Sequence, residues 1–145
     1  MALLGGGGGG GPVGVSNSFT GSANTIEKVS GKWWGGWSGL VSITSSDSPV
    51  TMFQFVSPNK ALLMHFTYCV NDLNLGDVNN IGYQIQMNGS IMVTVQDSSG
   101  EARSLGTLST PLDIVIPPST EVVIQGLTDD SSNLSVSGII VAEVI

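Results

Sequence analysis

From residue 31 onward the chain consists of short apolar runs separated by clusters of turn-forming residues. This spacing is typical of a β-sandwich or barrel, and the alternation of Ser, Thr, Asn and Gln with Val and Ile suits strands. The runs occupy residues 38–44, 50–56, 60–71, 81–88, 91–97, 102–108, 112–116, 120–127 and 134–145. We therefore predict an all-β domain, an antiparallel β-sandwich of eight or nine strands. The count depends on whether Pro117 and Pro118 form a tight hairpin or a bend in one long strand.

The composition favours the same fold class and argues against one kind of partner. Of the 145 residues, 41% are hydrophobic and only 10% are charged. Helical proteins usually place Glu, Lys and Arg on their exposed faces, so helix is the less favoured choice. The net charge is -7 and only four residues are Lys or Arg. Because binding to a phosphate backbone needs clustered cations, we expect no nucleic-acid partner.

The sequence indicates neither export nor membrane insertion. The apolar residues 2–4 are too few for a signal peptide, and no run of 18 apolar residues occurs. Cys69 is the single cysteine, so the fold does not depend on an intrachain disulfide. A chain of this length predicts one domain, which we expect to be made in a host cytoplasm.

The first 30 residues differ from the rest in composition. They include seven consecutive glycines, 5–11, and few large side chains, too few to offset the entropy of ordering the chain. We predict a flexible Gly/Ser-rich arm over 1–30 and a sandwich domain over 31–145. The arm has no basic residue before Lys28, so we expect it to dock onto protein. Its candidate docking residues are Leu3, Leu4, Val13, Val15 and Phe19.

The segment IGYQIQMNGSIMVTVQD, residues 81–97, predicts a hairpin with one buried and one polar face. A two-residue turn at 88–89 would pair Met87 with Ser90 and turn the valines of the second strand toward the glutamines of the first. We predict instead a three-residue loop over 87–89 with a bulge. That register sets Ile85 opposite Ile91 and Tyr83 opposite Val93.

Two predicted strands are apolar on both faces. In 60–71 one face carries large apolar residues and the other includes Leu63 and Cys69, and in 134–145 the second face includes Ile139, Val141 and Ile145. A sandwich strand needs only one buried face, so the second face needs cover from the arm or another subunit. The pattern favours homo-oligomerisation.

The stretch GKWWGGWSG places Trp33, Trp34 and Trp37 within five residues. Tryptophan anchors cores and subunit interfaces, and this is the favoured interpretation. The alternatives are contact with a different protein, or stacking on sugar rings in a glycan-binding module, adhesin or receptor-binding domain.

Catalysis and metal binding are not predicted. His65 and Cys69 lie four residues apart on one strand, about 13 Å at the strand rise, so they cannot form a dyad. The segments NDLNLGDVNN (71–80) and TDDSSN (128–133) are rich in oxygen ligands that suit Ca²⁺, but turns use the same residues. We predict no catalytic residue, no cofactor and no metal.

The closing segment PLDIVIPPSTEVVIQGLTDDSSNLSVSGIIVAEVI and the hairpin QIQMNGSIMVTVQ resemble the strands of small viral and bacteriophage jelly-roll proteins. The resemblance covers residues 38–145 and is one of sequence style, which adhesins and carbohydrate-binding modules share. It implies a jelly roll and a capsid-associated protein of decoration, cement or spike type. It further implies location in the virion, no catalysis and commonly a homotrimer whose arm docks onto other capsid proteins.

Overall fold

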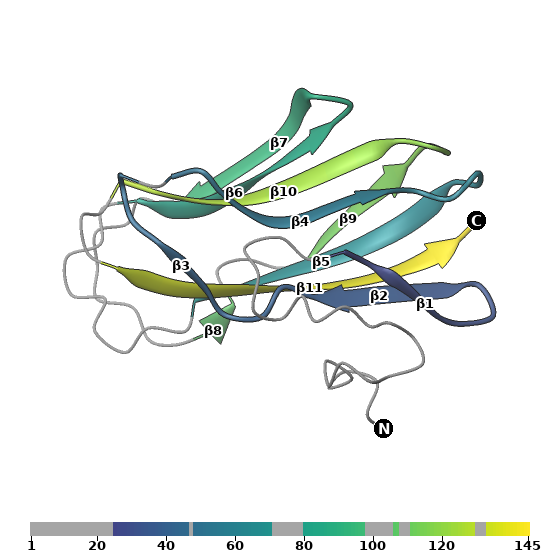
Figure 1. Ribbon diagram of the computed structural model, residues 1–145, viewed down its shortest axis with the longest axis horizontal. Coiled ribbons are helices and arrows are strands. Elements are labelled where there is room, and N and C mark those ends of the chain that lie inside the picture. The colour runs from purple at the N-terminus through teal and green to yellow at the C-terminus, as the bar shows by residue number, and fades with distance from the viewer. Residues whose placement is uncertain (1–24, 47, 71–79, 98–105, 108–110, 130–132) are drawn as a thin grey trace.

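The computed structural model describes residues 25–46, 48–70, 80–97, 106–107, 111–129 and 133–145. In these residues it contains strands and no helix, so no helix there is long and apolar enough to cross a membrane. The strands are β1 (Glu27–Ser30), β2 (Trp33–Trp37), β3 (Val41–Ile43), β4 (Val50–Val56), β5 (Leu62–Val70), β6 (Ile81–Met87), β7 (Ser90–Asp97), β8 (Gly106–Thr107), β9 (Leu112–Ile116), β10 (Glu121–Thr128) and β11 (Leu134–Val144). They form two antiparallel sheets packed face to face (Figure 1), which confirms the predicted all-β sandwich.

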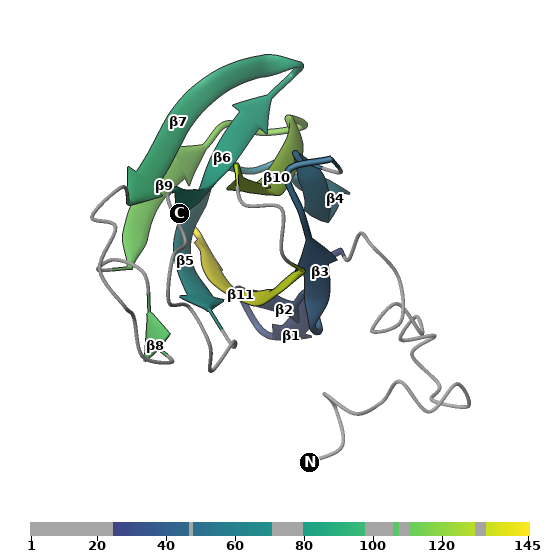
Figure 2. The same ribbon diagram turned by 90° about the vertical axis from the view of Figure 1, so that its left-hand side faces the viewer.

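The strand order is that of a jelly roll. One sheet has seven strands in the order β1-β2-β11-β5-β8, with β3 also paired to β11 and β9 also paired to β5; the other has the order β4-β10-β6-β7. Without β1, β2 and β8, the sheets are β3-β11-β5-β9 and β4-β10-β6-β7. Every connection between these eight strands then crosses from one sheet to the other except the β6–β7 hairpin, as in a double Greek key. Figure 2 shows the sheets from one end, with the core enclosed between them.

The folded domain begins earlier than predicted. Strand β1 lies inside the segment 1–30 that we assigned to the arm, and it pairs with β2, which was not predicted as a strand either. Ile26 is buried in the core. Gly36 makes this possible, because a Cβ there would lie 2.7 Å from the Thr25 carbonyl oxygen. The boundary is therefore corrected toward residue 25, and residues 1–24 lie outside the described residues.

The β6–β7 hairpin corrects the predicted register. Met87 pairs directly with Ser90, so the turn has two residues, Asn88 and Gly89, both with positive φ. A bulge then places one extra residue, Met92, in β7. After the bulge Ile85 pairs with Val93 and Tyr83 with Val95, and both valines pack against the core. The three-residue loop was wrong, because the bulge and not the turn supplies the odd residue that keeps the valines inward.

The inner faces of the two sheets form one core that includes a cluster of aromatic rings. Phe66 lies between Phe53 and Tyr83, with ring centroids 6.3 Å and 4.9 Å away and edge-to-face geometry. Tyr68 packs beside them, and its hydroxyl is buried with no hydrogen-bond partner among the residues that the structure describes. Burial raises the pKa of Tyr68 well above its ordinary value, since the phenolate would lose its hydration. The core also contains Phe55 and three methionines, its other buried residues are mostly aliphatic, and it is continuous between the sheets.

Candidate partner surface

The outer face of the seven-stranded sheet carries large apolar side chains from three strands. Directly paired residues of antiparallel strands share a face, and Trp37 pairs with Ile139 while Gly35 pairs with Val141. Along the same face Glu143 pairs with both Trp33 and Leu63, and Leu63 with Val115. We call Trp33, Trp37, Val115, Ile139 and Val141 the outer apolar patch. Each of these five side chains is 40% to 53% exposed, so the patch is a surface and not part of the core.

The edge strand β1 extends this patch. A Cβ on Gly35 would lie 3.4 Å from Cγ2 of Val29, which shows that the Val29 side chain lies over Gly35. Val29 is 64% exposed. Val29 and Val115 were not predicted as surface residues. The position of Val115 could have been predicted from the sequence, because it alternates with the inward Ile114 and Ile116 of β9.

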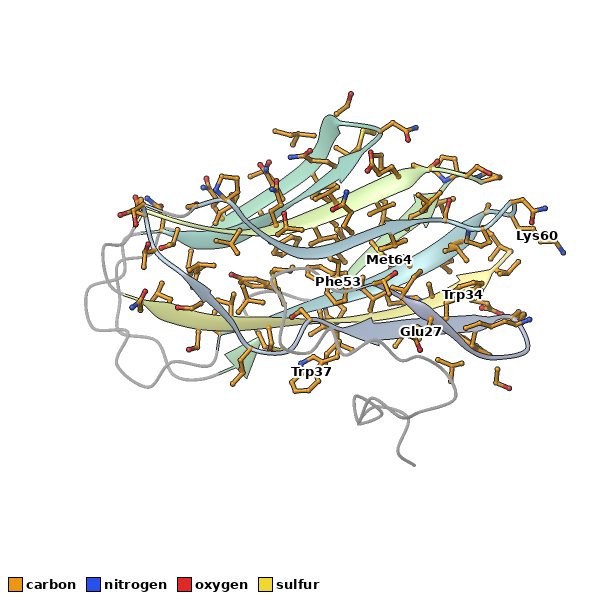
Figure 3. The ribbon with its side chains drawn as sticks, viewed as in Figure 1. Glu27, Trp34, Trp37, Phe53, Lys60 and Met64 are labelled. Carbon is orange, nitrogen blue, oxygen red and sulfur yellow. The ribbon has the colours of Figure 1, made fainter. Side chains whose placement is uncertain are left out.

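The tryptophan cluster is divided between the two sides of the sheet. Trp34 pairs with the buried Ala142 and packs against the core, whereas Trp33 and Trp37 are on the outer face. In Figure 3 Trp37 projects away from the sandwich, while Phe53 and Met64 lie between the sheets. The three rings therefore do not form one platform, because neighbouring positions on a strand point to opposite faces.

Two pairs of charged or polar side chains lie on this face, and Glu27 of β1, which pairs with Gly35, lies on it as well. Lys32, in the β1–β2 turn, forms an ion pair with Glu143 of β11. His65 of β5 lies with its Nδ1 2.6 Å from Oδ1 of Asp113 on β9. Val141 lies directly opposite His65 on the other neighbouring strand. Both pairs thus border the outer apolar patch.

The outer face of the four-stranded sheet is different in chemistry. Gln125 of β10 accepts hydrogen bonds at its Oε1 from the side-chain amides of Gln84 and Gln86, at 2.7 and 2.8 Å, and its own amide donates to the Thr51 hydroxyl at 3.4 Å. Next along β10, Glu121 accepts a hydrogen bond from Gln54. This ladder of amides is polar and already hydrogen bonded, and it separates the exposed apolar residues of this face, Val56 on β4 and Ile91 on β7.

Other predicted site residues are placed only in part. The candidate docking residues Leu3, Leu4, Val13, Val15 and Phe19 lie outside the described residues. Ile145 follows β11 and is 62% exposed, with its backbone N–H bonded to the Ala61 carbonyl. Within the described part of the oxygen-rich segments, Asp129 accepts hydrogen bonds from the backbone and side chain of Asn80. No three metal-ligating side chains gather among the residues that the structure describes.

The fold and this surface define a jelly-roll β-sandwich with an exposed apolar sheet face. No family model and no curated protein matches the chain. Among solved structures it is similar to the crystal structure of the infectious bursal disease virus VP2 subviral particle, with 13% identity and a TM-score of 0.52, over 82% of this chain and 37% of that one. The likeness shows a shared fold with a viral particle protein, and this chain spans little more than a third of that chain's length.

Two further solved structures are similar over part of the chain. The structure of the infectious bursal disease virus Gx strain matches with 17% identity and a TM-score of 0.41, over 77% of this chain and 29% of that one. A Paenibacillus cycloisomaltooligosaccharide glucanotransferase complexed with cycloisomaltoheptaose matches with 13% identity and a TM-score of 0.33, over 66% and 13%. At these scores neither likeness supports a conclusion about this chain.

Proposed function

We propose that this protein is a non-enzymatic structural component of a virion, a decoration, cement or minor capsid protein. The observation that carries the proposal is the jelly-roll strand order combined with an apolar face on one outer sheet. Jelly rolls are common in viral capsids, and the fold is shared with a protein of a viral particle. An apolar sheet face is covered when the protein assembles, since its burial stabilises association by about 25 cal/mol per Å².

The N-terminal segment provides a second means of attachment in this proposal. Residues 1–24 have no charged side chain, so docking them onto another capsid protein desolvates no charge. They join the domain at Thr25, beside β2 at the edge of the seven-stranded sheet. Fully extended, 24 residues span about 80 Å, which is enough to reach a neighbouring subunit. A homotrimer is the oligomer we favour, and nucleic acid is not part of the proposed contacts.

An alternative function is glycan binding by an adhesin or receptor-binding module. It is favoured by one observation, the exposure of Trp33 and Trp37 on the same face with only Gly35 between them on that face of the strand. Exposed aromatic rings stack on apolar faces of sugars. Saturable quenching of tryptophan fluorescence by a glycan, lost in Trp37→Ala, would support this alternative over the structural one.

The proposed function is tested on particles. Virus-sized particles banded from material that expresses the chain should contain it in amounts comparable to other particle proteins, as measured by quantitative mass spectrometry. Deleting residues 1–24 should leave the domain folded, because Ile26 and β1 are retained, and should remove the chain from the particles. If the full chain stays in the soluble fraction while other particle proteins band, the proposal is wrong.

A further inference from the structure

Charge is distributed unevenly between the seven-stranded sheet and the rest of the chain. The strands of this sheet and the β1–β2 turn carry three acidic residues, Glu27, Asp113 and Glu143, and two basic residues, Lys28 and Lys32. Their formal charge is -1, whereas the whole chain carries -7, so the remaining residues carry -6. Two copies of an acidic protein repel each other, and of the two sheets this one carries the smaller charge, because Asp97 and Glu121 give the strands of the other sheet -2.

Two carboxylates on the outer face already have a charged or polar partner. Glu143 is paired with Lys32, and the Asp113 carboxylate accepts a hydrogen bond from His65. Burying an unpaired charge is strongly unfavourable, whereas burying a charge that keeps its partner costs much less free energy. The two pairs flank the outer apolar patch, so Glu143 and Asp113 keep their partners when the patch is covered, while Glu27, opposite Gly35, lies at the β1 edge of the same face.

The area of the sheet lies at the lower end of what a stable dimer needs. Its seven strands contain 39 residues, each covering about 4.8 Å by 3.3 Å of the sheet. The face therefore measures roughly 600 Å² in plan, and stable interfaces bury about 600–1,000 Å² per partner. The outer face of the four-stranded sheet has the glutamine ladder at its centre, and its exposed apolar residues Val56 and Ile91 lie apart on the two edge strands β4 and β7.

From these observations we infer that the outer apolar patch is the contact for a second copy of this chain, with the two seven-stranded sheets packed face to face. In such a symmetric contact each copy presents the same residues, and Trp37 and Ile139 of one copy lie against the outer apolar patch of the other. Sheets pack in this way about 10 Å apart, with their side chains interdigitated. The inference deepens the proposed function, since it identifies the partner of the exposed sheet as the chain itself, and it replaces the favoured homotrimer by a two-fold dimer.

The experiment compares outward substitutions on the two sheets of the full chain. Ile139→Glu and Val141→Glu add a negative charge to each copy at the proposed contact, at positions already half exposed. Val56→Glu is the matched control, because Val56 is 65% exposed on β4 of the other sheet. Sedimentation velocity over a wide concentration range measures association, and circular dichroism confirms that each variant is folded.

We expect the wild-type chain and Val56→Glu to associate with the same dissociation constant. Each substitution in the patch should raise that constant at least about 30-fold, the loss typical of one central interface residue. A wild-type chain that is monomeric at every concentration would overturn the inference. So would Ile139→Glu associating like wild type, or association that depends on residues 1–24 and not on the patch.

These outcomes are independent of the particle experiment. If the chain is absent from virions but associates through the outer apolar patch, the proposed function fails and the dimer contact holds. If the chain is present in virions and Ile139→Glu associates like wild type, the proposed function holds and the dimer contact fails. The two proposals therefore fail on different measurements.

Discussion

Gly138 in β11 is the position where one added carbon tests the packing of the core. A Cβ there would lie 2.8 Å from Cε2 of Phe66, 3.0 Å from Cε2 of Phe53 and 3.2 Å from Cε of Met52. Distances below 3.0 Å do not occur between a real Cβ and its neighbours, so the Phe66 ring must move. Phe66 is itself held edge-on between Phe53 and Tyr83, and its movement displaces both rings.

The magnitude follows from two opposing terms. Overpacking a filled core destabilises by about 1–3 kcal/mol, and replacing a strand glycine by alanine recovers about 0.5–1 kcal/mol of conformational entropy. Gly138→Ala should therefore lower the free energy of unfolding by about 1 kcal/mol, and by at most about 2.5 kcal/mol. Gly126 in β10 provides the matched control, because a Cβ there would lie 3.4 Å or more from every neighbour, at ordinary contact distance. Gly126→Ala should raise the free energy of unfolding by about 0.4–1 kcal/mol.

Urea unfolding followed by tryptophan fluorescence measures both variants against wild type, with equal m-values as the check that the unfolded states are comparable. Gly138→Ala should show a lower midpoint than wild type and Gly126→Ala a higher one. A Gly138→Ala variant as stable as wild type would refute the packing argument, because it would show that the aromatic cluster has room for a methyl group.

Three further predictions use the same assay. Tyr68→Phe should stabilise the protein by about 0.5–1 kcal/mol, because it removes a buried hydroxyl that no described residue hydrogen bonds, and a loss of stability would contradict this. Tyr68 has a raised pKa in the folded state, so it keeps its proton there after the unfolded chain has lost it. The free energy of unfolding should therefore fall above pH ~10, by up to about 1.4 kcal/mol per pH unit. Tyr68→Phe should make this fall with pH less steep. Trp34→Ala should lower the free energy of unfolding by about 2–4 kcal/mol and Trp33→Ala by less than about 0.5 kcal/mol, because only Trp34 packs against the core. Equal decreases for the two variants would contradict the assignment of the two side chains to opposite faces.

Much of the sandwich could be predicted because most strands have one apolar face or a clear boundary. Strands β4 and β9 have the bounds that the apolar runs indicated, and turn clusters separate them from their neighbours. The β6–β7 register could not be obtained from parity alone. A bulge at Met92 and a three-residue loop both shift the parity by one residue, and only the paired positions tell them apart.

The start of the domain could not be predicted from composition. Residues 25–37 are rich in glycine and lack the alternation of a strand, and they become β1 and β2 because β11 offers an edge with free backbone groups. Gly36 contributes by its missing side chain, which leaves space for Thr25 and Ile26 against the inner side of β2. The local sequence around Gly36 suggests a flexible position, but tertiary packing requires a glycine there.

The partner surface could be predicted only in part from the pattern of two apolar faces. The pattern indicated that the second faces of β5 and β11 must be covered, but the outward residues of the two strands differ in exposure. On β5 the outward residues are half buried beneath their neighbours, whereas Ile139 and Val141 of β11 remain exposed. The charges that border them come from residues 32, 65, 113 and 143, far apart in the sequence and adjacent only through strand pairing in the seven-stranded sheet. The local pattern therefore identifies a face that needs cover, while the charged pairs that border this face arise from the topology.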